Sequence, residues 1–389
     1  MSKEDPFGGP TIYKDAEPKI GVNFTSDESK EILLDCLLNN SANPFFEIQD
    51  NFITQTFIAY CGPATISVIL NAIGVDPKAV FFRNWRWYSE SNVRSLDIEG
   101  VRNHGMVLPD LAFLVQDNGV NVKLYRTICE NNKNLENKID INLLNDEKKY
   151  DKLILYDDLS KVKGSSLFPN RLEELIKNKE QYFYFNLVNV DFLKALIYSS
   201  CYYDNFFMIL NVFRNDLGQV GWGHYMPVAA YNEKQDYVLI LDCGRFKYNS
   251  RWQKVDLVFK SLDGIDSATK NTRGFITAEK IIKKKILNIR QNEIKNIDED
   301  KLNQFIKLLK FDNLKDKAKI INWLIVNEVV IDGDFKNNEQ VWGKAVKNVY
   351  EKEKKFRDFL EFLFMFDRRN LKRNVLGCIM FCDDLNNSS

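Results

Sequence analysis

Short apolar runs separated by turn-forming residues dominate the stretch between residues 206 and 241. Phe206–Val212, Tyr225–Tyr231 and Tyr237–Leu241 combine β-branched, aromatic and aliphatic side chains and are bounded by Gly, Asn or Asp. Runs of this length and composition predict β-strands. Because the connections between them are short, we expect neighbouring strands to pair in an antiparallel sheet.

Apolar residues at helical spacing mark two other parts of the chain. Cys61–Asn71 is typical of an apolar helix whose first turn contains Pro63, where proline is tolerated. After about Lys283, apolar residues recur three and four positions apart in two groups, Leu302, Phe305, Ile306 and Leu309, and then Phe356, Phe359, Leu360 and Leu363. The second pattern predicts a C-terminal all-helical domain.

These patterns divide the chain into three parts. Residues 1–19 are expected to be a flexible lead-in, and residues 20–283 an α+β domain in which the apolar helix packs on the antiparallel sheet. Residues 284–389 form the predicted helical domain. Within the α+β part, Asn, Lys, Glu and Asp dominate about 130–189. We interpret that segment as a surface insertion, helical around Arg171–Lys179.

Charge and composition exclude several classes of protein. The chain has 54 Lys and Arg against 54 Asp and Glu, so its net charge is zero and gives no general attraction to nucleic acid or an acidic membrane. With 45% hydrophobic residues the composition is that of a folded protein. No apolar run reaches the length of a membrane span, and residues 1–19 lack the apolar core of a signal peptide.

Cysteine and histidine usage points to free thiols and restricts the chemistry. The seven cysteines are odd in number and widely spread, which favours a reducing compartment. We therefore expect a cytoplasmic protein, although export without a signal peptide stays open. Only two histidines occur, so imidazole chemistry must use His104 or His224. His104 lies in a polar segment that is more typical of a turn.

Cys61 is the first candidate for chemistry, because it lies where a loop meets the predicted helix. The positive end of the helix dipole favours a thiolate there, and a thiolate is a nucleophile. The ordinary alternative is a buried thiol that behaves as a small apolar side chain. Gln55 lies six residues upstream, where a side-chain amide could donate to a developing oxyanion. A solvated loop glutamine is its alternative.

His224 and Asp242 complete the candidate set. Gly221-Trp222-Gly223 precedes His224 at the start of a predicted strand, and Asp242 closes the strand that follows. If these strands pair through the turn at Asn232–Asp236, the carboxylate can orient the imidazole as in a catalytic triad. A structural histidine and an ordinary strand-end aspartate are the alternatives. Each of these residues taken alone could occur by chance, but the four together in the order Gln, Cys, His, Asp are much less easily accidental.

Other thiols and aromatic residues are weaker candidates. Cys243 is more typical of a packed strand thiol than of a metal or oxidant sensor. Cys378 and Cys382 are four apart, yet no further Cys or His lies near them to complete a zinc site. The aromatic cluster of Trp85, Trp87 and Tyr88 is more typical of a core or cleft wall than of a base-stacking platform.

At these residues the sequence resembles the phytochelatin synthase family of glutathione γ-glutamylcysteinyltransferases, which belongs to the papain-like clan. The matching text covers roughly residues 20–278, apart from the insertion. It comprises Gln55-Thr56, Ala59-Tyr60-Cys61-Gly62, Ala64-Thr65, Val68, Leu70-Asn71-Ala72, Trp85-Arg86-Trp87, Gly223-His224, Pro227, Leu239-Ile240-Leu241-Asp242, Arg245-Phe246-Lys247-Tyr248, Trp252 and Arg273-Gly274-Phe275.

The resemblance implies a role for each matched residue. Cys61 is then the nucleophile, His224 the general base and acid, Asp242 the orienting acid and Gln55 the oxyanion donor. The implied substrate contacts are Arg273 to the γ-glutamyl α-carboxylate, Gly223 by close backbone approach, and, less specifically, Arg245 and Tyr248. It also implies a papain-like core, with the helix bearing the nucleophile packed on an antiparallel sheet.

The implied activity is an acyl transfer that uses glutathione. Cys61 would cleave the Cys-Gly bond, release glycine and pass γ-Glu-Cys to a second glutathione, as in heavy-metal detoxification, or to water. The implied partners are glutathione and γ-Glu-Cys peptides, with no nucleic acid, no membrane and dimerisation left open. A papain-like peptidase or deamidase acting on a protein is the alternative, and a non-catalytic interaction module is a third.

The resemblance implies no covalent cofactor and leaves the metal sites open. Cd²⁺ or Zn²⁺ would act as activator or as the metal thiolate of glutathione. Eukaryotic members of the family commonly carry vicinal cysteines after the Trp-Arg-Trp segment and a cysteine-rich C-terminal half. Here Ser89–Gly100 contains no cysteine and residues 284–389 only two. Metal sensing through such cysteines is therefore not expected from this sequence.

Overall fold

A computed structural model gives the fold of the chain, and it describes residues 12–127, 185–269, 271–280 and 313–326. Most of the predicted insertion, with its expected helix around Arg171–Lys179, lies outside these residues. The same holds for both apolar groups on which the C-terminal helical domain was predicted.

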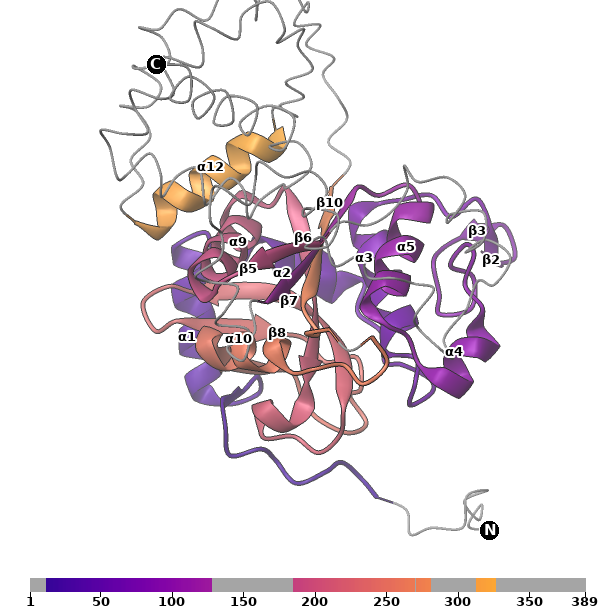
Figure 1. The fold of residues 1–389 in the computed structure, drawn as a ribbon, viewed down its shortest axis with the longest axis horizontal. Helices are drawn as coiled ribbons and strands as arrows, with labels where there is room; N and C mark the ends of the chain where they lie inside the picture. The colour runs from indigo at the N-terminus through magenta and orange to yellow at the C-terminus, as the bar shows by residue number, and fades with distance from the viewer. Residues whose placement is uncertain (1–11, 128–184, 270, 281–312, 327–389) are drawn as a thin grey trace, which may run out of the picture.

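An eight-stranded sheet forms the centre of the molecule (Figure 1). Its order is β1-β9-β8-β7-β6-β10-β4-β5, and every neighbouring pair is antiparallel except β4 and β5. The strands are β1 (Val22–Asn23), β4 (Val122–Thr127), β5 (Phe185–Val188), β6 (Phe206–Phe213), β7 (Gly223–Asn232), β8 (Tyr237–Ile240), β9 (Arg251–Lys254) and β10 (Phe275–Glu279). A separate hairpin pairs β2 (Val80–Phe82) with β3 (Trp85–Arg86).

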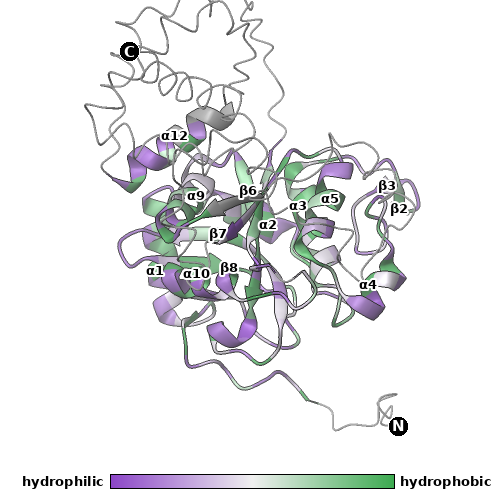
Figure 2. Ribbon diagram, in the orientation of Figure 1, coloured by the Kyte–Doolittle hydropathy of each residue, from purple (hydrophilic) through white to green (hydrophobic). Residues whose placement is uncertain are grey.

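Helices cover both faces of the sheet, because the central strands are apolar on both sides. Along β6, Phe206, Met208 and Leu210 belong to one core cluster, and Phe207 and Ile209 to the other. One cluster packs under α9 (Val190–Tyr203), α10 (Val255–Asp263) and α12 (Leu314–Val326). The other packs under α1 (Asp27–Leu38), α2 (Asn43–Asp50), α3 (Cys61–Ile73) and α5 (Leu108–Asp117). The short α4 (Ile98–His104) is largely hydrophilic (Figure 2).

The predicted α+β class and the three predicted strands are confirmed. The runs expected to be strands became β6, β7 and β8, and Cys61 begins α3 as expected. His104 was expected in a turn but is the last residue of α4, and its side chain is exposed. One boundary was wrong: β5, placed in the predicted insertion, is a strand of the main sheet that pairs with β4. Its few apolar residues follow a long polar segment, so composition alone hid it.

Segments on both sides of the predicted α+β domain, residues 15–17 and α12, pack against it. In the supposed lead-in, Glu17 pairs with the buried Arg251 at 2.7 Å, and Asp15 lies 3.5 Å from the ammonium of Lys247. These ion pairs hold residues 15–17 against β9 and the loop that precedes it. At the other end, α12 packs on α9 and shares its core cluster. None of the described helices combines the length and apolarity needed to cross a membrane.

Candidate active site

Cys61 occupies the first position of α3, and its side chain is partly exposed. Every residue of this helix from Gly62 to Leu70 is buried, which fixes the helix against the sheet. Thr65, one turn further on, donates its hydroxyl hydrogen to the carbonyl oxygen of Tyr225 on β7 at 3.3 Å. A thiol at this position experiences the positive end of the helix dipole beside the strand that carries the histidine.

His224 and Asp242 meet through a short hydrogen bond. His224 is the second residue of β7 and Asp242 follows β8, and the two strands are antiparallel neighbours as predicted. The Nε2 atom of His224 lies 2.6 Å from Oδ1 of Asp242, and both side chains are buried. With Nε2 committed to the carboxylate, Nδ1 is the ring nitrogen left to serve Cys61.

The electrostatics favour a thiolate and an imidazolium. Burial by itself disfavours ionisation of Cys61, but the charge of His224 and its hydrogen bond outweigh burial and lower the pKa of the thiol. Burial likewise opposes protonation of His224, yet the negative charges of Asp242 and Cys61 raise its pKa well above the ordinary value. Asp242 is buried, but His224 and Arg214 keep its pKa below the usual range. Both shifts favour the thiolate–imidazolium form of the pair over the neutral form.

Gln55 lies beside the triad, but its amide is engaged within its own loop. The amide nitrogen donates to the carbonyl oxygens of Phe57 at 2.8 Å and Ile58 at 2.9 Å. Its oxygen accepts from the thiol of Cys243 at 3.3 Å. The oxyanion role of Gln55 stays a prediction, and it requires one amide hydrogen to leave a loop carbonyl when substrate binds.

Arg273 and Gly223 lie against each other next to His224. The guanidinium of Arg273 is buried, lies 5.5 Å from the ring centre of Phe213 and contacts Asn211 at 3.4 Å, and its Nε has no partner. Among the described residues no carboxylate pairs with it. A Cβ atom at Gly223 would overlap this guanidinium, so any side chain at position 223 would force the guanidinium to move. The guanidinium of Arg273 is therefore a buried positive charge beside His224 that no described carboxylate pairs with.

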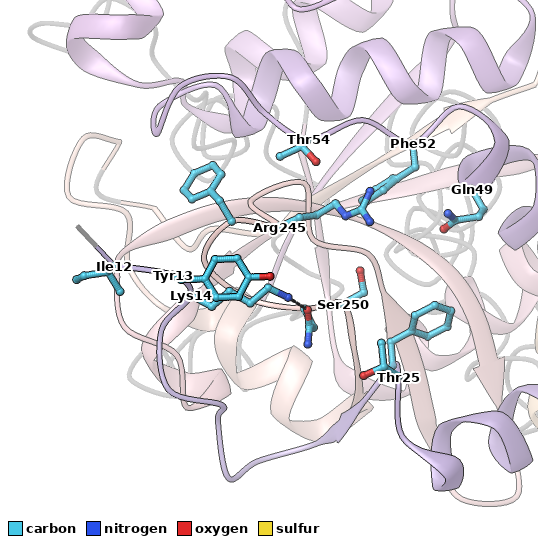
Figure 3. A pocket seen from close by; sticks show the side chains of 12 residues that line it. Ile12, Tyr13, Lys14, Thr25, Gln49, Phe52, Thr54, Arg245 and Ser250 are labelled. Atoms are coloured by element: carbon cyan, nitrogen blue, oxygen red, sulfur yellow. Dashed lines mark hydrogen bonds between the residues drawn. The ribbon is translucent and has the colours of Figure 1, made fainter. Parts of the chain in front are cut away.

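Arg245 lines a cavity of about 560 Å³ (Figure 3), and none of Cys61, His224, Asp242 or Gln55 is among the residues that line it. Thr54, which precedes Gln55, lies on the same wall, and Lys14 comes from the N-terminal segment. The Arg245 guanidinium lies 5.9 Å from the ring centre of Phe52. This placement leaves Arg245 available to a ligand in the cavity.

Tyr248, the less specific of the implied substrate contacts, is engaged within the protein. Its side chain is buried, and its hydroxyl oxygen accepts the N–H of Val220 at 2.8 Å. Its ring lies 5.3 Å from the guanidinium carbon of Arg214. Since its polar atom and one ring face are both in use, the geometry gives Tyr248 a structural role in the wall behind the triad.

One set of potential metal ligands occurs in the described part of the chain. His224, Asp242 and Cys243 place ligand atoms within 4.8 Å of one another. Two of the three are already bound to each other, and Arg214 occupies the same carboxylate. Cys243 is buried, and burial raises the pKa of its thiol. A metal at this set would displace the catalytic hydrogen bonds. Cys378 and Cys382 lie outside the described residues.

Three charged residues of the site were missed by the sequence reasoning. Arg214 grips Asp242, and Glu90 accepts the backbone N–H of Thr56 at 3.0 Å, which fixes the loop after Gln55. Asp266 is buried and close enough to Tyr225 to raise the pKa of that phenol, after burial itself. None belongs to a spacing pattern, because each reaches the site only through tertiary contacts.

A cysteine at a helix start, with an imidazole and a carboxylate on adjacent antiparallel strands, defines a cysteine-nucleophile site on an α+β scaffold compatible with a papain-like core. The comparisons with known sequences give the family. A model of the phytochelatin synthase family matches residues 12–275, and the chain belongs to that family.

Curated relatives carry the corresponding name. Glutathione gamma-glutamylcysteinyltransferase 1 of Arabidopsis thaliana is 27% identical over 268 residues, which are 68% of this chain and 43% of the relative. Glutathione gamma-glutamylcysteinyltransferase 2 of the same plant is 25% identical over 267 residues, or 68% and 46%. Glutathione gamma-glutamylcysteinyltransferase of Schizosaccharomyces pombe is 26% identical over 319 residues, or 80% and 62%. The match thus spans less than half of these plant relatives.

Proposed function

We propose that the protein is a glutathione γ-glutamylcysteinyltransferase, an acyltransferase of the phytochelatin synthase type. One observation carries the proposal: a Cys61–His224–Asp242 triad lies beside the buried, acid-free guanidinium of Arg273. A triad alone would serve many acyl donors. The added cation selects a donor with a carboxylate near the scissile amide. No comparison favours the alternative of a peptidase or deamidase.

The γ-glutamyl end of glutathione is a zwitterion, and the site offers both charges. Arg273 would pair with its α-carboxylate. The backbone N–H of Asp266 donates to Asn271 O, and that of Arg273 donates to Gly264 O. In this antiparallel pairing, positions 266 and 273 are diagonal neighbours whose side chains project from the same face. Asp266 is therefore placed to accept from the ammonium group of the same γ-glutamyl end.

The reaction follows from the ionised pair. The Cys61 thiolate attacks the carbonyl carbon of the cysteinyl residue, and the negative oxygen that forms is stabilised by the Cys61 N–H, an unpaired helix-start donor, and by the Gln55 amide. His224 donates its proton to the departing glycine nitrogen, which breaks the Cys-Gly bond and leaves a γ-Glu-Cys thioester on Cys61. Asp242 holds the ring in place through both steps.

Transfer needs an acceptor amine, which His224, now neutral, can deprotonate. The α-amino group of a second glutathione attacks the thioester, forms the new amide bond and frees Cys61. Arg245 and Lys14, which line the cavity of Figure 3, would supply positive charge for the carboxylates of this acceptor. If water attacks instead, the product is γ-Glu-Cys, so the balance between synthesis and hydrolysis depends on how well the acceptor fills the cavity.

The proposal extends to the surroundings of the enzyme. It works in the cytoplasm as part of the response to heavy metals, with no covalent cofactor. Cd²⁺ or Zn²⁺ enters as a thiolate complex of glutathione, because the ligand set within the triad is committed to catalysis. A homodimer is compatible with this scheme but is not required by it.

Incubation of the purified protein with glutathione, with and without Cd²⁺ or Zn²⁺, tests the proposal. Chromatography of the thiol products and of free glycine is the readout. Longer γ-Glu-Cys oligomers would establish the transferase, and γ-Glu-Cys with glycine alone the hydrolase. Absence of glycine release under every condition would refute the proposed substrate.

A further inference from the structure

Arg214 forms a two-pronged ion pair with the catalytic carboxylate. Its Nη1 lies 2.9 Å from Oδ2 of Asp242, and its Nη2 lies 3.1 Å from Oδ1. Oδ1 is also the oxygen that bonds His224. Both side chains of the ion pair are buried, so water screens it little. The fork therefore fixes the plane of the carboxylate and with it the direction of the bond to His224.

The fold holds the guanidinium in place from several sides. Arg214 begins the short 3₁₀ helix η5 (Arg214–Leu217) directly after β6, and its backbone N–H donates to the carbonyl oxygen of Trp222 at 3.0 Å. Nη1 also donates to the side-chain oxygen of Gln219. The ring of Tyr248 lies 5.3 Å from its guanidinium carbon. Because these contacts restrain the Arg214 guanidinium, it can hold the Asp242 carboxylate in a fixed position.

We propose that Arg214 is a positioning residue for this site: it holds Asp242 in one orientation and supplies the positive charge that keeps the thiolate form of Cys61 accessible. The effect on turnover rests on the proposed function. The effect on the ionisation of Cys61 does not, because it needs no substrate.

The direction of the electrostatic effect can be worked out from the neighbours. Arg214 lowers the pKa of Cys61 and also that of His224, in each case as a lesser contribution beside burial and the nearer charges. Loss of its charge should therefore raise both pKa values together. The other ionisable groups near the pair include Asp242 and Cys243 after β8, Tyr225 on β7 and the guanidinium of Arg273 against Gly223. Asp110, Arg126 and Asp266 act in turn on Tyr225.

The test measures the alkylation rate of Cys61 by iodoacetamide against pH, followed by mass spectrometry of the Cys61 peptide. We expect Arg214→Met to move the half-point of the profile upward, so that alkylation on the acid side is slower than in the wild type. Arg251→Met is the matched control. It also removes a buried, ion-paired arginine, but one that pairs with Glu17, and its profile should stay at the wild-type position.

Arg214→Lys separates charge from geometry and guards against a variant that does not fold. Lysine keeps the charge but cannot form the fork. We expect its alkylation profile to stay near that of the wild type, while glycine release from glutathione falls at least about tenfold. A wild-type profile in Arg214→Met, or wild-type glycine release in Arg214→Lys, would overturn the inference. If the wild type releases no glycine, the alkylation profiles still decide it.

Discussion

At the residue scale, the site depends on the charges of Cys61, His224 and Asp242, which stabilise one another although burial opposes each of them. Each group alone would be driven toward its neutral form by burial. Together they lower the pKa of the thiol and raise that of the imidazole, because each charge compensates its neighbour. The chemistry therefore belongs to the group and not to a single reactive cysteine.

Substitution of the nucleophile tests this directly. We expect Cys61→Ala to lower glycine release from glutathione by at least about a thousandfold, since no other described thiol both contacts His224 and is partly exposed. The thermal unfolding midpoint should stay close to the wild type, because the side chain is small and partly exposed. Cys243→Ala is the control for loss of a neighbouring thiol, and it should retain most of the glycine release.

The pH dependence follows from the same pair. The reactive form exists above the pKa of Cys61, which is lowered, and below the pKa of His224, which is raised. We expect a bell-shaped profile of kcat/KM, with its acid limb below the ordinary thiol range and its alkaline limb above the ordinary histidine range. A single ionisation at the usual pKa of a free thiol would show that no ion pair forms in the resting site.

At the scale of elements, the ends of three elements bring Cys61, His224 and Asp242 together: the start of α3, the start of β7 and the end of β8. The glycine that begins β7 and the turn before β10 place Arg273 next to His224. Gly274 adopts a positive φ of 68°, where a Cβ would overlap the carbonyl oxygen of Tyr125. Backbone shape at these ends, more than side-chain identity, sets the geometry of the substrate site.

Gly223→Ala should separate substrate binding from ionisation. The added methyl group overlaps the Arg273 guanidinium, so we expect KM for glutathione to rise about tenfold or more. The alkylation profile of Cys61 should not move, because the triad itself is untouched. An unchanged KM would contradict the assignment of Arg273 as the carboxylate-binding residue.

At the scale of the whole molecule, the sheet is buried on both faces, and the described C-terminal helix completes one of them. Ala318 and Ile321 of α12 are fully buried in the cluster that includes α9. The N-terminal segment is tied to β9, next to the edge strand β1, through the ion pair of Glu17 with Arg251. The catalytic scaffold is thus stabilised by residues outside the segments that carry the chemistry.

Ile321→Ala should therefore lower the free energy of unfolding by about 2–5 kcal/mol, because it opens a cavity in a dry core. Denaturant titration measures the change. Lys319→Ala on the exposed side of the same helix is the matched control, with an expected change within about 0.5 kcal/mol. Equal effects of the two substitutions would mean that α12 does not contribute to the core.

Several features followed from the sequence alone. The strands β6, β7 and β8, the start of α3 at Cys61 and the meeting of His224 with Asp242 were all predicted, because they depend on local hydrophobic patterns and on a short connection between adjacent strands. The resemblance in the same segments led to the family. A pattern that depends only on residues close together in the chain can be recognised from the sequence alone.

The tertiary structure decided what depends on distant contacts. It brought Arg214 to Asp242 across 28 positions and Glu90 to Thr56 across 34, and it turned Tyr248 into a support for the loop before His224. It also joined β5 to the main sheet. Long-range pairing of buried charges depends on how strands and loops pack, and no local spacing in the sequence indicates it. The sequence by itself therefore determined the reacting groups, and the tertiary structure determined which residues hold them in place.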